Sequence, residues 1–268
     1  MEKQPKSPSS FPQATSWIFI RGMVRAAAHW GDYPQQFEQS VPGAIVSCLE
    51  IPGNGKLIDK NSPLTVGAMT DALRQMYRTR TPDDILGLPT FIVGMSLGGM
   101  IVLDYLSRYP DDLCGAVTIN TSAGNVNPVY RRLNPFALLS FARIGMTRNP
   151  RQRERKILEL TAQSEPRRAA ALDNWSELAV SAPVNLTNSL RQLVAAARFR
   201  LPENLPRKPL LMLNSAADRI AHPSCSRRIA ERWHADLKTN PYAGHDLPID
   251  DPEWITEAIQ EWRRSRKL

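Results

Sequence analysis

A serine, an aspartate and a histidine, far apart in the chain, are of the types that together perform nucleophilic chemistry. Ser96 lies in the pattern Gly94-x-Ser96-x-Gly98, and Asp218 and His245 follow it in that order. A serine becomes an effective nucleophile when a histidine removes its proton and an acid orients that histidine. We therefore predict that Ser96 is the nucleophile, that His245 is the general base and that Asp218 is the orienting acid.

The two glycines around Ser96 agree with this role on geometric grounds. The apolar run at residues 90–93 predicts a strand that leads into the motif, and a helical pattern follows it. A nucleophile on so sharp a turn needs small neighbours, because side chains two residues away would collide with the strand or the helix. The start of the helix would direct the backbone N–H of Leu97 toward a developing oxyanion. By itself, the motif is also compatible with a glycine-rich turn that only permits close packing.

The elements that must position these residues follow from the apolar pattern. Five apolar runs and one further short segment predict strands, and the runs are continuous rather than alternating, which is typical of parallel strands buried on both faces. The predicted strands span residues 16–20, 44–49, 90–93, 115–120, 210–213 and 236–241. The predicted helices span residues 65–78, 100–109, 224–234 and 252–266. We therefore predict an α/β fold in which a mostly parallel sheet is flanked by helices. The carboxyl ends of its strands would bring Ser96, Asp218 and His245 to one side.

The stretch from residue 125 to residue 206 departs from this alternation, because helical segments follow one another there without a strand. It holds 13 basic and 6 acidic residues, which gives it +7 of the chain's net charge of +8. We predict that it forms a basic helical cap, inserted between two parts of the core at residues 16–124 and 207–268. Residues 1–15 are predicted to form a flexible leader.

The composition of the predicted cap leaves two interpretations open. Its basic side chains could simply face solvent, or they could form a docking surface for an acidic partner, such as a phosphopantetheine carrier, a coenzyme A ester or an anionic lipid headgroup. Nucleic acid is disfavoured, because tryptophan and tyrosine are not interleaved with the arginines. The apolar cluster at residues 135–139, with Phe141, is expected to form the core of the cap, or else to line a pocket.

From about Trp17 to Trp262, the chain resembles the α/β-hydrolase-fold serine hydrolases, in particular the small bacterial esterases and lipases. The resemblance is carried by residues 94–99, 214–218 and 244–246, and by the loop at 51–55, which is similar to the family's D-x-P-G-x-G. It implies an enzyme that hydrolyses carboxylic esters through an acyl-enzyme, without a metal or an organic cofactor. Because only about sixteen residues precede the first predicted strand, the family's first two strands are expected to be missing.

One departure from the family lies after the first predicted strand, where Arg21, Gly22 and Met23 stand in place of the usual His-Gly. By position, the resemblance still implies that the backbone N–H of Met23 is the second oxyanion donor, beside that of Leu97. Arg21 would alter the charge of the pocket.

Other side chains near the predicted site keep alternative roles. The remaining candidates for the pocket are His29, Trp30 and Met95, of which His29 could equally be structural. The acidic residues that compete with Asp218 as the orienting acid are Asp246, Asp250 and Asp251.

The composition also excludes several classes of protein. No window approaches about 18 consecutive apolar residues, so no segment is expected to span a membrane. The first sixteen residues lack the apolar core of a secretory signal. The three cysteines are widely spaced and form no Cys-x-x-Cys pair, so neither a disulfide framework nor a metal site is expected. We predict a cytoplasmic serine hydrolase.

Two alternatives to the hydrolysis of a small-molecule ester remain. The first is a hydrolase of carrier-bound acyl groups, either a thioesterase or an acyl-carrier methyl esterase, which would dock an acidic acyl-carrier protein through the basic cap. The second belongs to another class, a non-catalytic binding protein built on the same scaffold.

Overall fold

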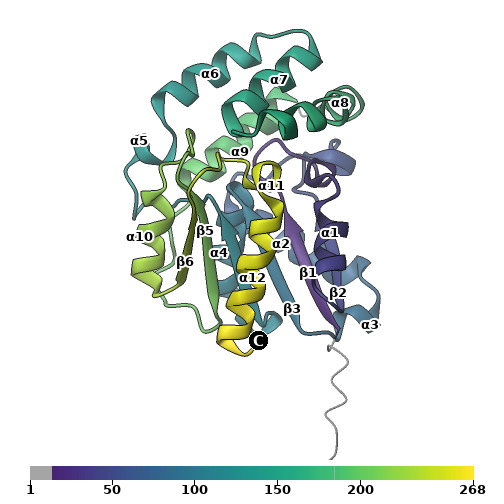
Figure 1. The fold of residues 1–268 in the computed structure, drawn as a ribbon, viewed down its shortest axis with the longest axis vertical. Helices are drawn as coiled ribbons and strands as arrows, with labels where there is room; N and C mark the ends of the chain where they lie inside the picture. Colours follow the sequence, from purple (N-terminus) through teal and green to yellow (C-terminus); the bar gives the residue numbers. More distant parts are fainter. Residues whose placement is uncertain (1–13, 184) are drawn as a thin grey trace, which may run out of the picture.

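A sheet of six strands forms the centre of the molecule. The structure is a computed structural model that describes residues 14–183 and 185–268. The strands are hydrogen-bonded in the order β2-β1-β3-β4-β5-β6, and every neighbouring pair is parallel (Figure 1). Their bounds are β1 Thr15–Ile20, β2 Ala44–Leu49, β3 Thr90–Met95, β4 Gly115–Ile119, β5 Leu210–Ser215 and β6 Asp236–Asn240. The predicted parallel sheet is confirmed, and in the described ranges it contains no antiparallel strand.

Helices cover both faces of this sheet. The helices α1 and α12 pack on one face, and α2, α4 and α10 pack on the other. Figure 1 shows α12 in front of the strands, with α2 and α4 behind them. Their bounds are α1 Tyr33–Ser40, α2 Val66–Arg80, α4 Leu97–Arg108, α10 Ser224–Trp233 and α12 Pro252–Arg266. The predicted α/β architecture is therefore confirmed.

The strand β1 shows why both faces must be covered. Trp17 and Phe19 pack in the cluster formed with α1 and α12. Ile18 and Ile20, which point the other way, pack in the cluster formed with α2 and α4. All four side chains are buried, and burying a side chain of this size contributes about 1.5–3 kcal/mol. The register places Ile20 opposite Gly94 of β3, so the ends of these two strands lie side by side.

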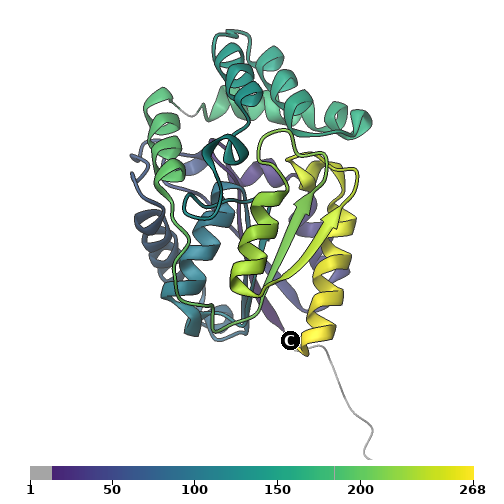
Figure 2. The ribbon, with the colours of Figure 1, turned by 90° about the vertical axis from the view of Figure 1, so that its left-hand side faces the viewer.

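Five helices lie between β4 and β5 in the described part of the chain, and we call them the helical insertion. They are α5 Val129–Arg132, α6 Pro135–Gly145, α7 Pro150–Thr161, α8 Glu165–Ser181 and α9 Leu186–Arg198. Figures 1 and 2 show α6, α7 and α8 beyond the carboxyl ends of the strands, at the end of the molecule far from the carboxyl terminus. A small core of Leu158, Leu172 and Trp175 joins α7 to α8. Across the described ranges, no helix has the length and the apolar character needed to cross a bilayer.

The structure also contains short elements that the sequence pattern does not predict. The helices α3 and α11 have four residues each, too few to show a helical period, and α1 buries only Tyr33 and Phe37. The short elements are α3 Asp83–Leu86, α11 Leu247–Asp250 and the 3₁₀ turns η1 Ala27–Trp30, η2 Gly55–Leu57 and η3 Pro110–Asp112. Thr15, predicted to belong to the leader, begins β1 and donates its N–H to Gly43 at 2.8 Å. Residues 1–13 of the predicted leader lie outside the described residues.

The prediction that the apolar cluster at residues 135–139 forms a core is wrong for most of its large side chains. Phe136, Leu138 and Leu139 are exposed. In α6 only Ala137 and Ile144 are buried. These two lie on one side of the helix, so α6 packs on the rest of the insertion through a single narrow face.

Candidate active site

Ser96 occupies the turn between β3 and α4. Its φ of 55° and ψ of −113° lie in a region that residues with a side chain rarely adopt, and such strain is concentrated at functional sites. The N–H of Ser96 donates to the carbonyl oxygen of Ile119 at 2.8 Å. The hydroxyl of Thr121 donates to the carbonyl oxygen of Ser96 at 2.9 Å. The end of β4 therefore fixes Ser96 at the carboxyl edge of the sheet.

The glycines around Ser96 are required by close packing. A Cβ atom on Gly94 would lie 2.3 Å from the carbonyl oxygen of Gly98, and a Cβ atom on Gly98 would lie 2.4 Å from that of Ile20. A side chain at either position would therefore collide with backbone. Packing alone would not need a strained serine between the two glycines, so the strain at Ser96 favours a chemical role.

Asp218 and His245 come together at the same edge of the sheet. Nδ1 of His245 lies 2.8 Å from Oδ2 of Asp218, and the two side chains are 8% and 1% exposed. The other carboxylate oxygen, Oδ1, accepts the N–H groups of Ile220 at 2.8 Å and Ala221 at 3.0 Å. Asp218 is thus fixed by the backbone that follows it, and it can in turn fix the imidazole ring.

Burial and the neighbouring carboxylates act on His245 in opposite directions. Burial favours the neutral ring and lowers its pKa, whereas the charge and hydrogen bond of Asp218 raise it, and so does the charge of Asp246. The net pKa of His245 lies above the ordinary value for histidine. A carboxylate that accepts the Nδ1 proton also sets the tautomer, which leaves Nε2 free to act as a base.

Asn120, which sequence reasoning missed, connects the two parts of this arrangement. It follows Ile119, the acceptor of the Ser96 N–H, and its Nδ2 donates to the carbonyl oxygen of His245 at 2.8 Å. Its Oδ1 accepts the N–H of Ser215, at the end of β5, at 2.9 Å. Among the described residues the Ser96 hydroxyl makes no hydrogen bond to His245; such contacts often tighten only with substrate bound.

Asp250 attaches the loop that carries His245 to the helical insertion. Its carboxylate accepts the N–H groups of Gly244 at 2.7 Å, Gln163 at 2.8 Å and Ser164 at 2.8 Å. A Cβ atom on Gly244 would lie 2.6 Å from the carbonyl oxygen of Thr161, so only glycine allows this close approach. The connection between α7 and α8 is therefore built against the histidine loop.

Arg21, predicted to alter the charge of the pocket, is enclosed in an ion pair. Its two terminal nitrogens donate to the carboxylate oxygens of Asp246 at 3.0 and 2.7 Å, and both side chains are almost fully buried. The guanidinium also lies 4.9 Å from the ring centroid of Trp30 and 3.5 Å from the sulfur of Met95. Its charge is neutralised directly beside His245 rather than presented to a substrate.

The acids that competed with Asp218 have other partners. Asp246 is bound to Arg21, and Asp250 holds the backbone of the histidine loop. Asp251 caps α12 through the N–H of Trp254 and accepts from Nδ2 of Asn240 at 2.9 Å.

His29 and Trp30 lie in η1, where they are buried by packing. The ring of His29 meets that of Trp175, in α8, edge to face at 5.0 Å, and its Nδ1 accepts the N–H of Ala26 at 3.0 Å. Burial, and then the charges of Arg25 and Arg21, lower the pKa of His29 to about 2. His29 therefore stays neutral, and it joins the core of the molecule to the helical insertion.

Of the predicted oxyanion donors, Leu97 directly follows Ser96, and Met23 follows Gly22, which lies close to Ser96. Leu97 is the first residue of α4, so its N–H has no acceptor within that helix. A Cβ atom on Gly22 would lie 3.2 Å from Cβ of Ser96 and 3.8 Å from its Oγ. The chain that leads to Met23 therefore passes directly over the nucleophile.

A buried amide network, absent from the sequence-based prediction, holds the segment after Met23. Val24 has a φ of 60° and donates its N–H to Oε1 of Gln192, in α9, at 2.8 Å. Nε2 of Gln192 donates to Oδ1 of Asn54 at 2.7 Å, and Nδ2 of Asn54 donates to the carbonyl oxygen of Arg25 at 3.0 Å. Asn54 falls in the resemblance-bearing loop at 51–55, but no sequence signal marked Gln192.

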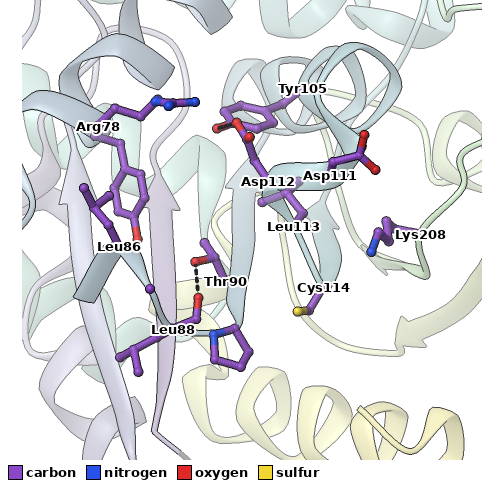
Figure 3. A pocket seen from close by; sticks show the side chains of 13 residues that line it. Arg78, Leu86, Leu88, Thr90, Tyr105, Asp111, Asp112, Leu113, Cys114 and Lys208 are labelled. Atoms are coloured by element: carbon purple, nitrogen blue, oxygen red, sulfur yellow. Dashed lines mark hydrogen bonds between the residues drawn. The ribbon is translucent and has the colours of Figure 1, made fainter. Parts of the chain in front are cut away.

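Of two cavities in the described structure, one lies at a predicted catalytic residue and the other does not. One of about 250 Å³ touches Asp218 and lies against α5, with a lining of Tyr130, Arg131, Asn134, Asp218, Arg219 and His222. The other, of about 570 Å³, is lined by Thr90 at the start of β3 and Cys114 just before β4 (Figure 3). Since β3 spans six residues, roughly 20 Å at about 3.3 Å per residue, this larger cavity is remote from Ser96.

No group of three or more His, Cys, Asp or Glu side chains suited to holding a metal ion occurs within residues 14–183 and 185–268.

The sheet order, the strand–serine–helix turn and the Asp218–His245 pair at one edge of the sheet define an α/β-hydrolase fold. Residues 64–252 match the model of the family described as serine aminopeptidase, S33, and the chain belongs to that family of hydrolases. No curated protein matches the sequence.

Solved structures with the same fold cover nearly the whole chain. BpoC of Mycobacterium tuberculosis, described as a non-haem bromoperoxidase, has a TM-score of 0.72 and 20% identity over 94% of this chain and 92% of its own. An enol-lactonase of Burkholderia xenovorans has a TM-score of 0.71 and 17% identity over 93% and 91%. A thermophilic esterase of Thermogutta terrifontis has a TM-score of 0.68 and 19% identity over 96% of each chain. At these identities the likeness establishes the fold, which hosts several chemistries.

Proposed function

We propose that the protein is a serine hydrolase that cleaves carboxylic esters through an acyl-enzyme. The observation that carries this proposal is the 2.8 Å hydrogen bond between Nδ1 of His245 and Oδ2 of Asp218, at the same sheet edge as the strained turn of Ser96. Membership in a hydrolase family and the likeness to an esterase and a lactonase agree with it.

In the proposed reaction, Nε2 of His245 removes the hydroxyl proton of Ser96 while the serine oxygen attacks the ester carbonyl. The tetrahedral intermediate then collapses, and the alcohol leaves with the proton carried by His245. Water attacks the acyl-enzyme with His245 again as the base, which releases the acid and restores Ser96. Asp218 holds the ring in position and stabilises its positive charge.

The oxyanion would be held by the backbone N–H groups of Leu97 and Met23. The first has no acceptor within α4, and the second follows Gly22, where an added Cβ atom would lie 3.2 Å from Cβ of Ser96. Removing one such donor typically costs a factor of about 10²–10³ in kcat.

The helical insertion would act as a cap over this site, as predicted for residues 125–206, with residues 16–124 and 207–268 forming the catalytic core. Two contacts support this role: Asp250 links the insertion to the histidine loop, and Arg25 pairs with Glu154 of α7 at 2.8 Å. A cap in this place would limit access of water and select the acyl group.

Peptide hydrolysis is the alternative raised by the family's description. An aminopeptidase must bind the charged amino terminus of its substrate, which calls for a carboxylate free to receive it. The carboxylates of Asp218, Asp246 and Asp250 are engaged with protein groups, and the stretch at residues 125–206 carries 13 basic and 6 acidic residues. This environment favours neutral or anionic esters.

The alternative of a carrier-bound acyl substrate gains no support from Arg132 and Arg167, two arginines of the basic stretch that could dock the carrier. Arg132 donates to the carbonyl oxygens of Ala196 and Ala197. Arg167 pairs with Glu253 at 2.9 Å. These side chains bind the insertion to itself and to the core, so a small-molecule ester is the simpler substrate.

The test combines labelling by a fluorophosphonate probe with a chain-length panel of nitrophenyl esters and a matched panel of aminoacyl nitroanilides. We expect labelling and ester hydrolysis by the wild type. Ser96→Ala should abolish labelling and lower kcat by about 10⁴-fold or more, whereas Ser122→Ala, at another buried serine, should keep both. A folded wild-type protein that is not labelled would favour the non-catalytic alternative, and faster cleavage of the nitroanilides would favour a peptidase.

A further inference from the structure

One face of α6 is apolar and has no partner in the described structure. Phe136 is 82% exposed, Leu138 51%, Leu139 50%, and Met146, just after the helix, 74%. At 100° per residue these four side chains fall on the half of the helix opposite its buried face. Large apolar side chains gathered in this way mark an interaction site more often than scattered ones do.

The short helix α5, which precedes α6 in the chain, exposes two more large apolar side chains. Val129 is 77% exposed and Tyr130 63%. We call this combined region the α5–α6 surface, made up of Val129, Tyr130, Phe136, Leu138, Leu139 and Met146.

The chain segment that carries the α5–α6 surface has basic but no acidic side chains. From residue 125 to residue 153 the chain contains six arginines and no aspartate or glutamate. Arg143 and Arg148 are exposed, and neither forms an ion pair with an acidic side chain in the described ranges. An apolar face edged by arginines is complementary to a surface with an apolar interior and anionic headgroups.

The position of the surface agrees with a flat partner. Figures 1 and 2 show α6 at the outer end of the molecule, beyond the strands and away from the sheet. Its exposed apolar side chains, Phe136, Leu138, Leu139 and Met146, line neither of the two cavities described above, so a bilayer can receive them without a complementary pocket.

We propose that the α5–α6 surface docks the protein onto bilayers that carry anionic phospholipid headgroups. Phe136, Leu139 and their neighbours enter the boundary between headgroups and acyl chains, and Arg143 and Arg148 contact phosphate groups. The docking needs no chemistry at Ser96 and therefore stands apart from the proposed hydrolysis.

The test measures binding of the Ser96→Ala variant to vesicles by co-sedimentation, so that hydrolysis of lipid cannot interfere. Vesicles of phosphatidylcholine alone are compared with vesicles in which about 30% of the lipid is phosphatidylglycerol. We expect at least about tenfold tighter binding to the anionic vesicles, and weaker binding when salt rises from about 0.1 to about 0.5 M.

A first pair of substitutions tests the apolar contribution. Phe136→Ser with Leu139→Ser should weaken binding to anionic vesicles by at least about tenfold. The matched control is Leu186→Ser with Leu190→Ser, which removes two equally exposed apolar side chains from α9 and should change binding by less than about twofold. The conservative change Phe136→Leu should keep binding near that of the unsubstituted protein.

A second pair tests the charge. Arg143→Glu with Arg148→Glu should remove the preference for anionic over neutral vesicles. Arg227→Glu with Arg232→Glu, at exposed positions of α10, makes the same change in net charge and should preserve that preference. Circular dichroism of each variant verifies that it is folded.

Three results would overturn the proposal. Equal binding to neutral and anionic vesicles would remove the role of the arginines, and equal losses in the control variants would remove the role of this surface. Sedimentation that shows a dimer, lost in the Phe136→Ser and Leu139→Ser protein, without vesicle binding, would assign the surface to a second copy of the chain.

Discussion

The proposed reaction depends on the charge of the His245 ring. It must be neutral to take the proton of Ser96. Burial lowers its pKa, but the charge and hydrogen bond of Asp218 and the charge of Asp246 raise it, and the net pKa lies above the ordinary 6.5 for histidine. For a neutral ester, kcat/KM should therefore rise with pH and level off with a midpoint above 6.5. Below the midpoint it should fall about tenfold per pH unit.

The matched variant for this pH profile is Asp218→Asn. It removes the carboxylate that raises the pKa of His245, so the midpoint should move down, and kcat should fall by about 10³–10⁴-fold because the ring is no longer held in the useful tautomer. A wild-type midpoint at or below 6.5, or an Asp218→Asn profile identical to that of the wild type, would remove the role given to this pair.

Gln192 is expected to act as a positioning residue for the segment that bears Met23. Its Oε1 accepts the N–H of Val24, so Gln192→Leu should release this segment and lower kcat by about 10- to 100-fold with a smaller change in KM. The matched control is Asn188→Leu, one turn earlier in α9. Asn188 is equally buried but binds the backbone of Lys60 and Ser62 instead.

A loss of stability alone would affect both α9 variants in the same way. If Asn188→Leu lowers kcat as much as Gln192→Leu, the network around Gln192 is only structural. Steady-state kinetics on a soluble nitrophenyl ester, with thermal unfolding of both variants, separates the two cases.

Residues differ in how far the sequence can predict them. Ser96 is marked by glycines two residues away, and Asp218 and His245 by their places just after predicted strands, because those signals are local. The ion pair of Arg21 and Asp246 joins positions 225 residues apart, and no local pattern indicates it. Gln192 looks like any polar residue of a helix until the fold brings Val24 beside it.

Between elements, the buried pair of Arg21 and Asp246 joins the end of β1 to the start of α11. Each charge is desolvated and depends on the other, so Arg21→Met or Asp246→Leu alone should cost about 3–5 kcal/mol in the free energy of unfolding. The double variant should cost less than the sum, because neither charge is then left alone. Urea unfolding measures all three values.

An exposed pair supplies the comparison for this double-mutant cycle. Arg167 and Glu253 are 42% and 58% exposed, and their coupling, measured with Arg167→Met and Glu253→Gln, should stay below about 1 kcal/mol. A coupling free energy for the buried pair that is no larger than that of the exposed pair would contradict the role of Arg21 and Asp246 in holding β1 to α11.

Elements follow the sequence where their signal is long and continuous. The strands β1, β3, β4 and β5 could be predicted because each is a run buried on both faces, and α12 because Ile255, Ile259 and Trp262 share one side. The burial of α6 was predicted wrongly, since apolar composition alone does not say whether a face meets protein or solvent. The four-residue helices α3 and α11 are set by their contacts rather than by a period.

In the molecule as a whole, the proposed catalytic residues and the proposed membrane-docking surface lie in different places. The proposed catalytic residues lie at the carboxyl edge of the sheet, beneath the helical insertion, while α6, with its exposed apolar side chains, lies at the outer end of the same insertion (Figures 1 and 2). A protein docked by α6 would keep its sheet away from the bilayer. The contacts of Asp250, Glu154 and Trp175 then determine whether the insertion and the sheet remain one unit.

The stability of the contact between the insertion and the sheet should depend on pH because of His29, which lies in η1 and packs against Trp175 of α8. Its pKa is about 2 when folded and about 6.5 when unfolded. Below pH 6.5 the unfolded chain therefore binds a proton that the folded protein does not. The stabilising effect of the neutral ring is complete above 6.5 and is lost as pH falls, by about 1.4 kcal/mol per unit.

Urea unfolding between about pH 7 and pH 5 measures this effect, since that window lies below the unfolded pKa for most of its width. His29→Gln should be less stable than the wild type at pH 7, because the contact with Trp175 is weakened, yet its stability should depend less steeply on pH, by up to about one proton. His234→Gln, at an exposed histidine after α10, should keep the slope of the wild type. If the stability of His29→Gln depends on pH as steeply as that of the wild type, the acid sensitivity of the fold arises from other groups and not from the neutral ring of His29.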